Sequence, residues 1–289
     1  MTSPEPRRLL LVHAHPDDES ITTGGTIARY AAEGAEITLV TCTLGEEGEI
    51  IPPHLDELGS WAADQLGGYR SGELAAACSA LGVTEHRYLG GIGRWRDSGM
   101  AGTPAADHPR AFVRGSLDEQ ASQLAAILDE VRPEVVVTYD EIGGYGHPDH
   151  IRAHEITMAA APRAGSVRRI FHIAASARAT AAGLAALRAL PELPLRVPED
   201  GELPVVPDER ITTAIDITAH RDAKIAALGA HATQVSVLGV PEGVAGGMPM
   251  KQPAFALSNG LAQPIPDHEY FVLAHGPEAG VATDLFGNR

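Results

Sequence analysis

The residues in this sequence that are best suited to chemistry lie in one short segment near its start. Residues 12–19 read VHAHPDDE, so two histidines and three acidic residues follow one another closely. Imidazole and carboxylate groups together suit a catalytic zinc or non-haem iron ion, and a further carboxylate can serve as general base on water. Ionisable groups crowded in this way are costly unless they are paired or bound to a metal. We therefore expect a metal or catalytic site here, rather than a polar loop that only ends a strand.

A second segment of similar chemistry lies far downstream. Residues 143–150 read GGYGHPDH, and His154 follows His150 at a spacing of four. On a helix this spacing would also suit a metal, although a surface histidine is the favoured interpretation of His154. His13 and His15 share one face of a strand. Spacing alone therefore leaves the metal ligands open among these histidines.

An apolar run that is typical of a buried parallel strand leads into each of the two segments, at residues 8–13 and 134–139. Strand and helix patterns alternate up to about residue 175, which predicts a Rossmann-like, doubly wound α/β fold. Its sheet is mainly parallel and has helices on both faces. In the strand order 3-2-1-4-5, the first and fourth strands are neighbours at the switch point, where ligands bind beyond the carboxyl ends. The two segments are therefore expected to meet in one crevice.

The remaining elements follow from periodicity and from turn residues. Thr22 or Thr23 is a candidate cap for the first helix, and Ser116 with Glu119 forms a capping box for the third. The helices expected from these signals are 22–33, 66–81, 116–131, 148–160, 176–190 and 219–231. The further strands expected are 36–42, 85–89, 169–174, 213–217 and 270–274.

The order of elements loosens after residue 175. We expect residues 1–175 to form the Rossmann-like metal-binding catalytic domain. Residues 176–289 form a smaller, less regular C-terminal part that completes the substrate cleft and does not fold independently. This part is either an appendage or the outer edge of the sheet. Long loops are expected at 90–115 and, rich in glycine and proline, at 239–253.

Composition limits the possible partners. The 289 residues carry a net charge of −16, which argues against a nucleic-acid partner and against an anionic membrane surface. Two cysteines are too few for a disulfide framework, and the apolar run after Arg8 is too short for a signal peptide or a membrane span. No nucleophile elbow of a serine hydrolase and no dinucleotide-binding glycine motif is present. We expect a cytoplasmic enzyme, and nothing in the sequence indicates its oligomeric state.

The pairing of HPDDE at residues 15–19 with HPDH at 147–150 resembles the signature of the LmbE-like (PIG-L) family of zinc-dependent N-acetylglucosamine deacetylases. Further stretches are similar to the branch of that family that removes acetate from N-acetylglucosaminyl-inositol in mycothiol biosynthesis; they are residues 45–49, 94–103, 143–146 and 231–234. The resemblance covers most of residues 8–175 and a patch near 220–235. It implies one zinc ion per chain, with Fe²⁺ as an alternative, and a small amino-sugar–inositol substrate.

The resemblance also implies which residues hold the metal and activate water. His15, Asp18 and His150 would bind the ion. Asp17 would be the general base for the attacking water. His13 would lie behind the site and orient a ligand.

The other implied roles concern the substrate. His147, held by Asp149, and Tyr145 would stabilise the oxyanion or assist the leaving amine. Three residues would hold sugar and inositol hydroxyl groups: Glu49, Arg70 and Asp97. Taken without the resemblance, Arg70 could equally be a solvated helix charge and Asp97 a turn residue.

Two alternatives to this function stay open. Within the family, a mycothiol S-conjugate amidase cleaves a related amide in a larger substrate. The second alternative belongs to another class of protein and is a non-catalytic sugar-binding module that uses the same crevice. Suitable residues occupy every position of the general base and of the metal ligands, which argues against the sugar-binding module.

Overall fold

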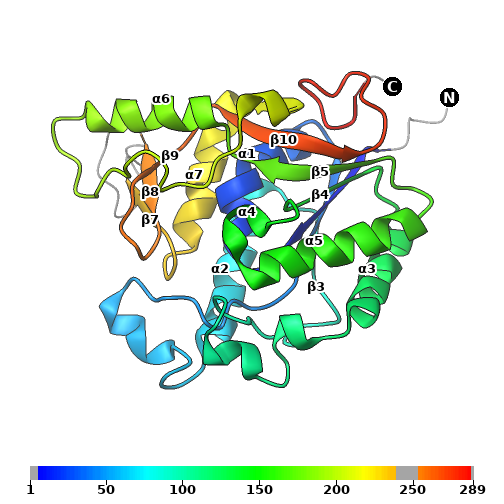
Figure 1. The fold of residues 1–289 in the computed structure, drawn as a ribbon, viewed down its shortest axis with the longest axis horizontal. Helices are drawn as coiled ribbons and strands as arrows, with labels where there is room; N and C mark the ends of the chain where they lie inside the picture. Colours follow the sequence, from blue (N-terminus) through cyan, green and yellow to red (C-terminus); the bar gives the residue numbers. More distant parts are fainter. Residues whose placement is uncertain (1–5, 239–252, 288–289) are drawn as a thin grey trace.

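The computed structural model describes residues 6–238 and 253–287 and has a seven-stranded sheet at its centre (Figure 1). The strands are β1 (Arg8–His13), β2 (Glu36–Thr41), β3 (Glu85–Tyr88), β4 (Val135–Thr138), β5 (Arg169–Ala174), β6 (Thr213–Asp216) and β10 (His268–His275). Their order is β3-β2-β1-β4-β5-β10-β6. The first five are parallel, and β10 and β6 are antiparallel to their neighbours. The expected order of the first five strands is confirmed.

Helices cover both faces of this sheet (Figure 1). They are α1 (Asp18–Ala32), α2 (Leu66–Leu81), α3 (Leu117–Val131), α4 (Gly143–Gly146), α5 (Pro148–Ala160), α6 (Ala177–Arg188) and α7 (Arg221–Ala230). The 3₁₀ turns are η1 (Pro53–Leu58), η2 (Pro104–Asp107), η3 (Phe112–Arg114), η4 (Ala161–Arg163), η5 (Asp208–Arg210) and η6 (Thr218–His220). Among the described residues, no helix combines the length and the apolar character needed to cross a membrane.

The central strand β1 is buried on both of its faces. Leu9 and Leu11 belong to one hydrophobic cluster, which also contains residues of α1, α2 and α7. Leu10 and Val12 belong to a second cluster with residues of α3 and α5. Successive side chains of a strand point to opposite faces, so a continuous apolar run serves both clusters. The strand that carries the first candidate segment is therefore held rigidly between two cores.

Helix α1 begins earlier than the sequence indicated. It starts at Asp18 instead of after a cap at Thr22 or Thr23, and its N-cap is Asp17. Asp18 and Glu19 lie in the first turn, where negative charge is favourable near the helix N-terminus. The acidic residues of the first segment are thus fixed by a helix as well as by a strand.

The C-terminal part contributes to the main sheet and also builds a small sheet of its own. Ile215 of β6 and Phe271 of β10 lie in the same hydrophobic cluster as Leu11, so the C-terminal strands form the outer edge of the sheet. The small antiparallel sheet consists of β7 (Ser236–Leu238), β8 (Ala254–Ala256) and β9 (Gln263–Pro264). Most of the glycine- and proline-rich loop expected at 239–253 lies outside the described residues.

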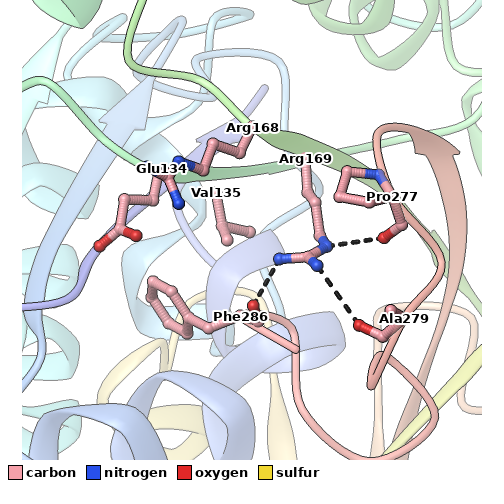
Figure 2. Close-up of a pocket in the computed structure, with 7 residues that line it drawn as sticks. All are labelled: Glu134, Val135, Arg168, Arg169, Pro277, Ala279 and Phe286. Carbon is pink, nitrogen blue, oxygen red and sulfur yellow. Dashed lines mark hydrogen bonds between the residues drawn. The ribbon is translucent and has the colours of Figure 1, made fainter. Parts of the chain in front are cut away.

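The last described segment of the chain packs against the amino ends of β4 and β5. Arg169 donates hydrogen bonds to the carbonyl oxygens of Pro277, at 2.9 Å, of Ala279, at 3.4 Å, and of Phe286 (Figure 2). These residues line a hollow together with Val135. Because the hollow lies at the amino ends of parallel strands, it is separate from the crevice expected at their carboxyl ends.

A buried ion pair joins α1, α7 and β10, and it allows a prediction about stability. Lys224 Nζ lies 2.6 Å from Glu269 Oε1, and both side chains are almost fully buried. Lys224→Met is expected to lower the free energy of unfolding by about 3–5 kcal/mol, because the buried Glu269 carboxylate loses its cationic partner. Urea unfolding measures this. As a control, Arg178→Ala removes an exposed partner of Asp208 and is expected to cost less than about 1 kcal/mol. Equal losses in the two variants would contradict the prediction.

Candidate metal centre and active site

The two polar segments meet at the carboxyl ends of β1 and β4, which are neighbours in the sheet. The ring centroids of His15 and His147 are 4.6 Å apart, and those of His15 and His150 are 5.3 Å apart. All three rings are buried. The expectation that the two segments converge is confirmed.

Asp18 lies between two imidazoles, one from each segment. Its Oδ2 is 3.4 Å from His15 Nδ1 and 3.4 Å from His150 Nε2. Burial alone would raise the pKa of Asp18, but the adjacent His150 and His15 hold that pKa well below its usual range. His150 Nε2 is buried and has no hydrogen-bond partner among the described residues. A buried polar atom without a partner costs free energy, which a bound cation would offset. Two nitrogen donors and one carboxylate fit zinc or ferrous iron.

The same cluster contains other donors. Ligand atoms of His15, His147 and His150 lie within 4.8 Å of one another, and so do those of His15, Asp97 and Asp149. Geometry alone therefore offers His147 as a further ligand beside the three residues expected from the sequence.

Asp149 contacts two histidines of the cluster, His15 through its carboxylate and His147 through its backbone N–H. Its Oδ2 lies 3.2 Å from His15 Nε2 and accepts the Ser98 N–H at 2.9 Å. Only its backbone N–H reaches His147, donating to Nδ1 at 3.1 Å, because His147 is the N-cap of α5. Asp149 therefore holds His147 through its backbone N–H, since a cap side chain turns back to the first N–H groups of its own helix, and its carboxylate is left to face His15. A carboxylate on His15 Nε2 leaves Nδ1, which faces Asp18, free to bind an ion.

Asp17 has an unusual backbone conformation and a shifted pKa. Its φ of 112° is rare for a residue other than glycine, and such strain costs about 1–3 kcal/mol and gathers at functional sites. Its Oδ2 lies 3.0 Å from the Arg70 guanidinium. Burial raises the pKa of Asp17 to about 6, although Arg70 acts in the opposite direction. A carboxyl group with such a pKa can take up a proton near neutral pH.

The three residues expected to bind hydroxyl groups differ in position. Arg70 is buried, faces Asp17 and donates to the Gly45 carbonyl at 2.6 Å. Asp97 is buried, and its Oδ1 lies 3.5 Å from His15 Nε2. Glu49 is exposed in the loop after β2. The structure therefore brings Arg70 and Asp97 to the cluster, while Glu49 lies at the surface.

His147 and Tyr145 both lie against the ring of His150. Burial, together with the neighbouring His15 and His150, lowers the pKa of His147 to about 3, so its ring is neutral at pH 7. Because His147 Nδ1 accepts a backbone N–H, the ring proton is on Nε2, which can therefore donate. The Tyr145 side chain is 55% exposed, and its ring centroid is 5.1 Å from that of His150. Both residues can donate a hydrogen bond.

Tyr139 contacts the cluster, although the sequence motifs did not single it out. Its hydroxyl donates to Asp18 Oδ2 at 2.7 Å and accepts the Ala14 N–H at 2.9 Å. Its ring stacks on that of His150 with centroids 4.2 Å apart. His13, expected to orient a ligand, contacts this tyrosine ring and not a candidate ligand. A polar aromatic residue at the end of an otherwise aliphatic strand was the available signal.

The sheet and this cluster together define a doubly wound α/β protein with a candidate catalytic metal centre at its switch point. The chain belongs to the PIG-L family, whose model, described as GlcNAc-PI de-N-acetylase, matches residues 10–161. The family resemblance noted from the sequence motifs is thereby confirmed.

Relatives of high identity extend over nearly the whole chain. A protein of Saccharomonospora viridis is 63% identical, over 96% of this chain and 99% of its own. One of Actinosynnema mirum is 62% identical, over 99% of both chains. Both are named 1D-myo-inositol 2-acetamido-2-deoxy-α-D-glucopyranoside deacetylase.

A solved structure supports the fold. The N,N′-diacetylchitobiose deacetylase of Pyrococcus horikoshii aligns with a TM-score of 0.53 and 19% identity, covering 79% of this chain and 71% of that one. At this identity the comparison establishes the α/β architecture alone, since one fold can host many functions.

Proposed function

We propose that this chain is a metal-dependent N-deacetylase that hydrolyses 1D-myo-inositol 2-acetamido-2-deoxy-α-D-glucopyranoside to the free amine and acetate, a step of mycothiol biosynthesis. The observation that carries this proposal is the placement of Asp18 between His15 and His150, with Asp17 next to it in sequence. The relatives that bear this name match the chain from end to end, which supports the particular substrate. We also propose a cytoplasmic location.

We propose His15, Asp18 and His150 as the ligands of one metal ion per chain. Nitrogen and carboxylate donors of this kind suit zinc, with Fe²⁺ as the alternative. When bound, a divalent ion supplies a Lewis acid that acidifies water and polarises an amide carbonyl. Asp149 keeps His15 in the tautomer that leaves Nδ1 unprotonated, and Tyr139 fixes the Asp18 carboxylate.

The chain's own residues then divide the proton transfers between them. Asp17 takes a proton from the attacking water, because it is an ionised carboxylate held beside the cluster. His147 Nε2–H donates to the carbonyl oxygen as negative charge develops there, and such a donor lowers the barrier by about 3–4 kcal/mol. Tyr145 is a second donor at the same side. The amine leaves after it receives a proton, and Asp17 can return to it the proton taken from water.

Recognition of the sugar and inositol rings is assigned to Asp97, Glu49 and Arg70. Arg70 Nε is buried without a hydrogen-bond partner in the described part of the chain, so it still has a donor to offer. Residues 176–289 complete the cleft in this proposal.

A comparison of two substrates tests the function. We expect kcat/KM for acetate release from the acetylated disaccharide to exceed kcat/KM for amide cleavage in a bimane–mycothiol conjugate at least about tenfold. This factor corresponds to roughly 1.4 kcal/mol in transition-state binding. A preference for the conjugate would identify an S-conjugate amidase instead. Tight binding of the disaccharide without release of acetate would identify a sugar-binding module.

A further inference from the structure

Glu19, the last residue of the HPDDE segment, uses both of its carboxylate oxygens inside the protein. Oε2 accepts the backbone N–H of Asp17 at 3.0 Å. Oε1 lies 2.7 Å from His231 Nε2 and accepts the Ser20 hydroxyl at 2.5 Å. The side chains of Glu19 and His231 are both completely buried. One carboxylate thus connects His231 to the backbone of Asp17.

The backbone of Asp17 needs such a connection. With a φ of 112°, Asp17 is in a conformation that persists only where the surroundings determine it from several sides. Its carbonyl oxygen accepts the N–H groups of Ser20 and Ile21, both at 2.9 Å, as the first bonds of α1. Its own N–H is bonded to Glu19 alone among the described residues. The hydrogen bond from Asp17 to Glu19 therefore sets the direction in which the Asp17 side chain leaves the backbone.

His231 reaches Glu19 from a distant part of the chain. It follows directly after α7, outside residues 10–161 that match the family model. The turn that carries it is fixed to α2, because Glu73 accepts the N–H of Thr233 at 2.8 Å and its hydroxyl at 2.7 Å. His231 Nδ1 has no hydrogen-bond partner in the described structure, so the imidazole bonds only through Nε2.

We propose that Glu19 and His231 form a positioning pair that holds Asp17 in its strained conformation and so aims its carboxylate at the attacking water. His231 would thereby contribute to catalysis without touching the substrate. This inference rests on the proposed function, in which Asp17 is the base. It predicts that the pair affects turnover rather than substrate binding, because neither Glu19 nor His231 is among the residues assigned to the substrate.

Two substitutions at one position test the pair. In His231→Gln the side-chain amide N–H falls where Nε2 stands and can still donate to Glu19. In His231→Asn the amide falls where Nδ1 stands and cannot reach Glu19. We expect His231→Asn to lower kcat about 10–100-fold with an unchanged KM, and His231→Gln to recover most of that loss. Zinc affinity, measured by competition with a chelating dye, is expected to stay the same in both variants. His275→Asn, at an exposed histidine of β10, is the control.

A double-mutant cycle separates positioning from a general structural effect. In the Asp17→Asn background, His231→Asn is expected to cause no further loss of kcat, because it acts through Asp17. An additional loss of the same size there, or an unchanged kcat of His231→Asn in the native background, would overturn the inference. Full activity of Asp17→Asn by itself would instead overturn the assignment of the base. If His231→Asn does not fold, Glu19→Gln replaces it. This isosteric change leaves one acceptor oxygen for three donors and is expected to give the same fall in kcat, while a native kcat would refute the pair.

Discussion

Asp17→Asn is expected to lower kcat about 10²–10⁴-fold and to leave the metal content unchanged, because a general base contributes a factor of this size. The amide has nearly the same shape as the carboxylate but cannot take up the proton of water. Asp17 is not among the proposed ligands, and its Oδ2 faces Arg70. Metal analysis together with steady-state kinetics on the acetylated disaccharide measures both quantities.

The variant needs a control, because Arg70 loses its ionic partner. Asp107→Asn changes a carboxylate that is 87% exposed on η2, and it is expected to leave kcat and thermal stability unchanged. Asp17→Asn with a native melting temperature and a strongly reduced kcat would separate chemistry from folding. Unchanged turnover would refute the role of Asp17, while a loss of metal would place it among the ligands.

The sheet could be predicted from the sequence because its strands carry their own signals. An apolar run serves two cores at once, so β1 was expected at 8–13 and is found at Arg8–His13. The strand order placed the two polar segments together without any knowledge of side-chain positions, since parallel strands present their carboxyl ends at one edge. The convergence of His15 and His150 could therefore be predicted from the strand order alone.

Contacts between distant elements gave no such signal. The hydrogen bond between Glu19 and His231 depends on where α7 ends relative to α1, and no periodicity encodes that distance. The direction of the Asp149 side chain depends on His147 being the N-cap of α5. The His147 ring turns back to the start of its own helix, and the Asp149 carboxylate points to His15, which follows β1. Strands β6 and β10 were expected as strands. The sequence carries no signal that β10 pairs with β5 and β6 with β10, because an antiparallel strand bears no mark of its partners.

Loss of a proposed ligand is expected to have the largest effect of all. His150→Ala and Asp18→Ala are each expected to abolish stoichiometric zinc binding and to lower kcat/KM at least about 10³-fold. This corresponds to roughly 4 kcal/mol of transition-state stabilisation, a loss that removal of the Lewis acid would account for. The matched control is His154→Ala, one turn further along α5, whose Nδ1 contacts the Tyr139 carbonyl at 3.0 Å. This variant is expected to retain both metal and turnover.

Removal of the metal from the native protein completes the test. Dialysis against a chelator is expected to abolish acetate release, and the ion that restores it, zinc or Fe²⁺, identifies the metal that the site uses. His147→Ala tests whether His147 is a fourth ligand beside the three proposed ones, since its ligand atom lies within 4.8 Å of those of His15 and His150. Retained zinc with a low kcat would support His147 as a hydrogen-bond donor to the oxyanion, while lost zinc would make it a ligand. Full activity of metal-free protein would exclude the metal centre, because Asp17 alone cannot offset the poor reactivity of an amide toward water.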